Sequence, residues 1–102
     1  MVALQRLPAY GKDKETLVSF HAERVRYAVA AGLRVLAFET VPDLIEAQAI
    51  AEVMDAHAAA EGADVEAWVG FTCGTSERVD NGDLLSDCVA ALKDCASSLR
   101  LE

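Results

Sequence analysis

Residues 33–48 read LRVLAFETVPDLIEAQ, and this stretch decides the fold. Its first six residues form a nearly continuous apolar run, which is typical of a β-strand buried on both faces of a parallel sheet. Pro42 ends the strand, and Asp43 followed three residues later by Glu46 is typical of a helix N-terminus with a capping box. The strand therefore ends in a carboxylate, Glu39, directly before a turn and a helix.

Helices are predicted on both sides of this strand. Residues 14–31 place their apolar side chains on one arc at helical spacing, and Gly32 is suited to end that helix. His21 falls inside the arc, so we expect a core histidine with one ring nitrogen bonded to a neighbour rather than a catalytic group. The second helix begins after Asp43 and ends at Gly62, and one face of it carries Ala47, Ile50, Ala51, Met54 and Ala58.

A second strand and a third helix complete the pattern. Residues 65–72, VEAWVGFT, have the β-branched and aromatic content of a strand, and residues 73–83 form a polar loop in which Asn81 or Asp83 can cap the third helix. The apolar stripe of that helix is Leu85, Cys88, Val89, Leu92 and Cys95. This order of helix, strand, helix, strand and helix predicts an α/β fold with two parallel strands, too few for a complete sheet, so we interpret the chain as a slice of a larger sheet or barrel.

Composition narrows the classes of partner. The chain has 102 residues, 53% of them hydrophobic, and a net charge of −8, so it lacks the basic surface that binds nucleic acid or an anionic membrane. No apolar run approaches the roughly 18 to 20 residues that cross a bilayer, and the first residues do not resemble a signal peptide. We therefore expect a cytoplasmic protein that binds a small molecule or another protein.

Two pairs of side chains follow the predicted strands. Glu39 and Thr40 end the first strand, and Thr72 and Cys73 end the second, so parallel pairing would place all four at one rim, where α/β proteins bind ligands. Glu39 can accept a hydrogen bond from a substrate ammonium or hydroxyl group, act as a general base, or anchor loop amides. For Cys73 a rim-lining thiol is favoured over a nucleophile, because His57 lies in the middle of the second helix.

The three cysteines do not form a recognisable metal or disulfide pattern. Cys73, Cys88 and Cys95 are odd in number and lack a C-x-x-C pair, so free thiols are expected. Their spacing matches none of the compact ligand pairs of structural zinc sites. No metal ligands are therefore assigned.

Two longer stretches resemble the homocysteine S-methyltransferase family. FHAERVRYAVAAGLRVLAFETVPDLIEAQAIAEVM is similar to its pattern F-H-x-x-R-x-x-x-L-x-x-A-G-x-D-x-x-A-F-E-T-x-P-x-x-x-E-A-x-A, and AWVGFTCGTSERVDNGDLLSDCV resembles the strand, loop and helix that follow. The resemblance covers about residues 10–95. The ends, MVALQRLP and SSLRLE, do not look like family segments, which is expected for a truncated or misjoined coding sequence.

The resemblance implies a fold and a reaction. Family members are (β/α)₈ barrels, which need about 250 residues, so residues 1–102 would form a single partial homocysteine-binding domain, approximately the helix before the fourth strand through the helix after the fifth. The family transfers a methyl group from S-methylmethionine, S-adenosylmethionine or, in one branch, betaine to homocysteine, which gives methionine. Homocysteine is thus the implied substrate.

The resemblance also implies that this sequence carries only part of the family's site. Zinc held by three cysteine thiolates activates homocysteine in the full-length family, and those cysteines belong to G-x-N-C and G-G-C-C motifs that this sequence lacks. We therefore expect no zinc in this chain and no methyl transfer by it alone. Glu39 occupies the family position near the homocysteine amino group, and Thr40, Thr72 and Cys73 would line the same pocket mouth.

Two other functions stay open. The chain can be a non-catalytic interaction module that docks on a full-length barrel or self-associates through exposed sheet edges. It can also be an unrelated small α/β domain with an activity that depends on Cys73, which requires unusual thiol reactivity at neutral pH.

Overall fold

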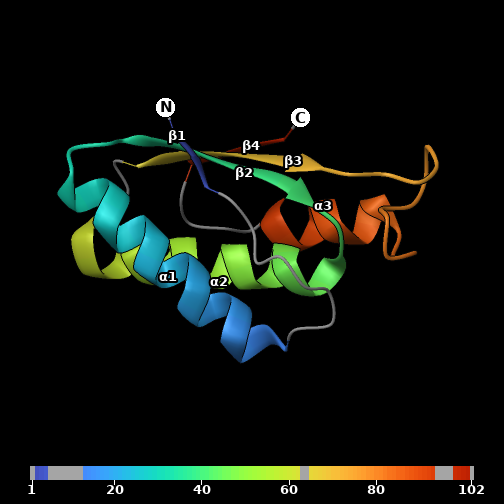
Figure 1. The fold of residues 1–102 in the computed structure, drawn as a ribbon, viewed down its shortest axis with the longest axis horizontal. Helices are drawn as coiled ribbons and strands as arrows, with labels where there is room; N and C mark the ends of the chain where they lie inside the picture. The colour runs from blue at the N-terminus through green and yellow to red at the C-terminus, as the bar shows by residue number, and fades with distance from the viewer. Residues whose placement is uncertain (1, 5–12, 63–64, 94–97, 102) are drawn as a thin grey trace.

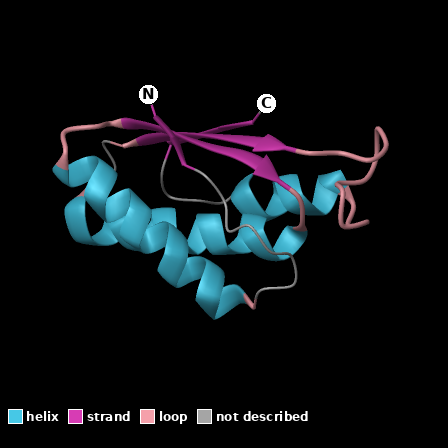
Figure 2. Cartoon of the chain, in the orientation of Figure 1, coloured by secondary structure: helices cyan, strands magenta, loops and turns pink. Residues whose placement is uncertain are grey.

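A computed structural model of the chain describes residues 2–4, 13–62, 65–93 and 98–101. Its helices and strands alternate along the chain, and the strands form one parallel sheet in the order β1-β2-β3-β4. The three helices lie together on one side of the sheet (Figure 1, Figure 2). No helix in the described ranges is long and apolar enough to cross a membrane. The elements are β1 (Val2–Leu4), α1 (Lys14–Ala30), β2 (Val35–Val41), α2 (Leu44–Glu61), β3 (Glu66–Phe71), α3 (Leu85–Lys93) and β4 (Ser98–Leu101).

The two predicted strands and three predicted helices are all present, and two short strands were not predicted. β1 pairs with β2, with Val2 opposite Leu36, and β4 pairs with β3, with Ser98 opposite Glu66. These outer strands have three and four residues, too few to show a period in the sequence. They lie in the end segments that the motifs had left outside the family resemblance.

The core lies between the sheet and the helix layer. Leu36 and Phe38 of β2, with Ala67 and Val69 of β3, are buried together with apolar residues of all three helices. Because side chains alternate along a strand, the residues between them face the other side of the sheet. No described helix covers that side, which we call the open face (Figure 2). It carries Val35, Ala37 and Glu39 of β2 and Glu66, Trp68 and Gly70 of β3.

The helix ends agree with the sequence prediction only in part. Gly32, with φ +97°, lies directly after the α1 C-cap, as predicted. The Asp43 side chain accepts a hydrogen bond from the Glu46 amide at 2.9 Å and caps α2, also as predicted. The Asp83 side chain, however, accepts from the Leu44 amide at 2.9 Å, so it supports the start of α2 instead of capping α3. Cys95 lies outside the described residues.

Candidate functional site at the carboxyl ends of the strands

A β-bulge shapes the end of β2. Phe38 pairs with Val69 and Val41 pairs with Phe71, so Glu39 and Thr40 together lie opposite the single residue Gly70. Thr40 has φ +65°, in the left-handed region that residues other than glycine seldom adopt. The extra residue shifts the alternation of side chains by one position beyond the bulge.

Because of this shift, β2 places side chains in the core both before and after the two exposed residues of the bulge. Phe38 and Val41, three positions apart, are both about 1% exposed and both pack in the core, which regular alternation would not allow. Glu39, one position beyond Phe38, therefore faces the open side of the sheet, and its side chain is exposed. The carboxylate lies at the carboxyl end of a parallel strand, where α/β proteins bind ligands.

Backbone hydrogen bonds tie the two loops at this rim together. The Thr72 amide donates to the Val41 carbonyl at 3.0 Å, and the Asn81 amide donates to the Pro42 carbonyl at 3.0 Å. With the bond from the Leu44 amide to Asp83, three contacts join the β2–α2 turn to the β3–α3 loop. Glu39 and Thr40 therefore lie at the same edge of the sheet as Thr72 and Cys73.

The four predicted site residues differ in their surroundings. Thr40 and Cys73 are exposed, whereas the hydroxyl oxygen of Thr72 is buried and has no hydrogen-bond partner among the described residues. Within the same ranges, no hydrogen bond or ion pair joins the side chains of Glu39, Thr40, Thr72 and Cys73 to one another. The rim is thus a set of separate polar groups around one carboxylate, open to a ligand.

Carboxylates of the two rim loops lie close to Cys88 in α3. This thiol is fully buried, and burial, followed by the negative charges of Asp83 and Asp43, raises its pKa from the ordinary 9.0 to about 11. Carboxylates beside a buried thiol disfavour its thiolate, and they favour a cationic group nearby. A cationic group suits this environment better than an anion.

The described cysteines do not fit the zinc ligand set that the family resemblance implies. Zinc binds thiolates, but the Cys88 thiol is buried with a raised pKa, and Cys73 lies exposed at the rim. Within the described ranges, no three histidine, cysteine, aspartate or glutamate side chains are grouped so that they could hold a metal ion. No chemistry is therefore assigned to a metal held by these residues.

Stability should fall with pH because of Cys88. The unfolded thiol ionises near pH 9.0 and the folded thiol near 11, so the unfolded state gains relative stability as pH rises through this window. We expect a loss of about 1 kcal/mol in the free energy of unfolding between pH 8 and pH 10 from this group. Urea unfolding of the wild type and of Cys88→Ala, which cannot ionise, measures it. Equal pH slopes for the two proteins would contradict the assignment.

A buried pair lies behind the rim, and the sequence interpretation predicted its histidine but not its partner. His21 Nε2 in α1 donates to Glu46 Oε2 in α2 at 2.8 Å, and the two residues are 1% and 4% exposed. His21 is therefore the core histidine that was predicted. Glu46, predicted to complete a capping box with its side chain, turns that side chain inward to His21. Its helical position, four residues before the buried Ile50, was the signal for an inward carboxylate.

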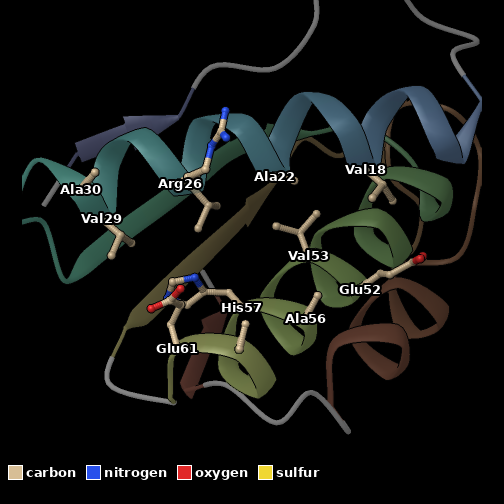
Figure 3. A pocket seen from close by; sticks show the side chains of 12 residues that line it. Val18, Ala22, Arg26, Val29, Ala30, Glu52, Val53, Ala56, His57 and Glu61 are labelled. Atoms are coloured by element: carbon tan, nitrogen blue, oxygen red, sulfur yellow. The ribbon is translucent and has the colours of Figure 1, made fainter.

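A groove of about 490 Å³ lies elsewhere on the molecule, between α1 and α2 (Figure 3). Its walls are mostly valine and alanine side chains, with Arg26, Glu52 and Glu61 among the charged ones. His57 also lines it, which agrees with the prediction that this histidine is remote from the strand ends. The groove is formed by the middle and the C-terminal parts of both helices, whereas α2 begins at the rim, so it is separate from the site at Glu39.

Known proteins resemble this chain over nearly its whole length. A sequence model of the homocysteine S-methyltransferase family matches residues 3–100, a longer span than the 10–95 expected from the motifs. Selenocysteine Se-methyltransferase of Brassica oleracea var. italica is 38% identical over 82 residues, which cover 79% of this chain and 22% of that protein. Homocysteine S-methyltransferase 3 of Arabidopsis thaliana is 35% identical over 83 residues, or 81% and 23% of the two chains.

Solved structures agree with these relatives. The apo form of the homocysteine methyltransferase MmuM from Escherichia coli superposes with a TM-score of 0.81 at 31% identity, covering 97% of this chain and 37% of that one. Its metallated form gives a TM-score of 0.76 at 33% identity, covering 90% and 31%. The chain spans about a quarter of the length of the curated relatives it matches.

Proposed function

The chain belongs to the homocysteine S-methyltransferase family, and from this premise we propose that it forms the part of a (β/α)₈ barrel that binds the amino group of homocysteine. In this proposal the sheet β1-β2-β3-β4 is one section of the barrel wall, its open face lines the barrel interior, and the helices α1, α2 and α3 lie outside.

The position of Glu39 carries the proposal. Its side chain is exposed on the open face, at the carboxyl end of β2. The bulge at Thr40 lets the strand place Glu39 on this face and its neighbouring apolar side chains in the core. A hydrogen bond from an ammonium group to a carboxylate contributes about 1.5–3 kcal/mol when it is shielded from water. The neighbouring acidic groups Asp43 and Asp83, which raise the pKa of Cys88, favour the same cationic ligand.

The other rim residues would complete the pocket mouth around the substrate. Thr40 is exposed in β2 next to Glu39, Cys73 is exposed where the β3–α3 loop begins, and Thr72 lies beside Cys73 with its hydroxyl oxygen buried. None of these groups is proposed to take part in the chemical step.

In the reaction of the family, the homocysteine bound in this way would accept a methyl group. The thiol of homocysteine loses its proton to solvent, its sulfur attacks the methyl carbon of the donor, a new carbon–sulfur bond forms, and the bond from that carbon to the donor's sulfonium sulfur breaks, leaving methionine and a neutral thioether. S-methylmethionine and S-adenosylmethionine are the proposed donors, and both are cations that the acidic rim would attract. We propose that the activation of the thiol needs strands of a full-length barrel, so this chain alone would not transfer the methyl group.

A titration with two ligands tests the proposed role of Glu39. We expect L-homocysteine to shift the backbone amide resonances of residues 39–41 with weak, millimolar affinity, and 4-mercaptobutanoate, which lacks the amino group, to leave them unchanged. Glu39→Gln should remove the shifts. Glu66→Gln, a carboxylate of the same face at the opposite end of the adjacent strand, should keep them. Equal shifts for both ligands, or none at about 20 mM homocysteine, would refute the proposal.

A further inference from the structure

We propose that His21 is a positioning residue, which holds the β2 bulge in the conformation that places Glu39 on the open face. The inference rests on the proposed function for what Glu39 binds. The effect of His21 on the backbone of the bulge does not depend on that function. His21 lies in α1, buried on the helix side of the sheet, so it acts through its neighbours and not by touching the ligand.

The His21 side chain contacts the strand just before the bulge and the helix that follows it. On the side before the bulge, the His21 ring lies 5.4 Å from the Phe38 ring, edge to face at 73°. On the side after it, His21 Nε2 lies 2.8 Å from Glu46 Oε2, and the Glu46 amide in turn donates to the Asp43 side chain at 2.9 Å. Residues 39–42 therefore run between two anchors that meet at His21.

The anchor after the bulge is a strong one. Glu46 lies in the first turn of α2, where the free amides of the helix end favour a negative side chain. The pair is fully enclosed, so its hydrogen bond does not compete with water. The other ring nitrogen, Nδ1 of His21, is buried without a hydrogen-bond partner among the described residues, so the hydrogen bond to Glu46 and the edge-to-face packing on Phe38 orient the ring.

The bulge needs such support because its backbone is strained. Thr40 holds φ +65°, which costs a residue with a Cβ about 1 kcal/mol or more and persists only where the surroundings determine it. Glu39 and Thr40 are both exposed, so packing of their own side chains contributes little to holding them. Fixing the residues on either side is the remaining way to set the direction of the Glu39 carboxylate.

The backbone of Thr40 provides a direct readout in the full chain without ligand. Its amide-to-Hα coupling constant and Cα chemical shift report the left-handed conformation. We expect His21→Gln, whose amide nitrogen can replace Nε2 as the donor to Glu46, to keep these signals, and His21→Leu to lose them. Leu92→Ala is the matched control, because it removes buried side-chain volume in α3 and should leave Thr40 unchanged. A folded His21→Leu chain with the wild-type Thr40 signals would overturn the proposal.

Two further measurements keep the test decisive. If His21→Leu does not fold, Phe38→Leu removes the other anchor while keeping an apolar side chain, and it too should lose the Thr40 signals. Unchanged signals would overturn the proposal. We also expect the dissociation constant for homocysteine to rise about tenfold in the His21→Leu or Phe38→Leu chain and to stay within about twofold in His21→Gln and Leu92→Ala. If His21→Leu loses the Thr40 signals and the wild type fails to bind homocysteine, the positioning role is supported and the proposed function is refuted.

Discussion

Replacing His21 by leucine is expected to lower the free energy of unfolding by about 3–5 kcal/mol, because the substitution leaves the Glu46 carboxylate buried without its hydrogen-bond partner. A small domain has a total stability of about 5–15 kcal/mol, so this one change would remove a large part of it. Urea denaturation followed by circular dichroism measures the loss.

The double variant separates this cause from a simple change of volume. His21→Leu combined with Glu46→Leu replaces both polar partners by apolar groups, which is often neutral or stabilising. The capping of α2 should survive, since it uses the backbone amide of residue 46 and the side chain of Asp43. We therefore expect the double variant to regain most of the lost stability. A double variant as unstable as the single one would show that the pair itself is not the source of the loss.

The strands show how far sequence patterns reach in this fold. The apolar run at residues 33–38 predicts β2, and the β-branched and aromatic content of residues 65–72 predicts β3. β1 and β4 are strands because β2 and β3 offer them a parallel partner, and three or four residues carry no period of their own. Their existence depends on tertiary pairing, which a local pattern cannot show.

The features of the site also differ in whether a local sequence pattern predicts them. The position of Glu39 at a strand tip follows from the apolar run and Pro42. The bulge does not, because Phe38, Glu39, Thr40 and Val41 give no local signal for an extra residue, and only the register with β3 reveals it. Likewise, Asp43 followed by Glu46 has the same spacing in a capping box and in a helix start whose carboxylate turns inward. The contact with His21, which comes from another helix, shows the inward direction of this carboxylate.

The central claim, that Glu39 binds the amino group of homocysteine in a barrel of this family, is tested most directly in a full-length setting. A chimaera carrying residues 3–100 of this chain in place of the matching segment of E. coli MmuM supplies the remainder of the barrel. The measurement is the rate of methionine formation from homocysteine and S-methylmethionine. Glu39→Gln keeps the shape of the side chain and removes its charge, and Glu66→Gln is the control at the other end of the open face.

We expect the chimaera to transfer the methyl group, Glu39→Gln to lower kcat/KM by about 100-fold, and Glu66→Gln to change it by less than about twofold. The 100-fold loss corresponds to about 2.7 kcal/mol, which is the range of a shielded hydrogen bond between opposite charges. A folded chimaera that forms no methionine, or one in which Glu39→Gln is as active as the parent, would contradict the account.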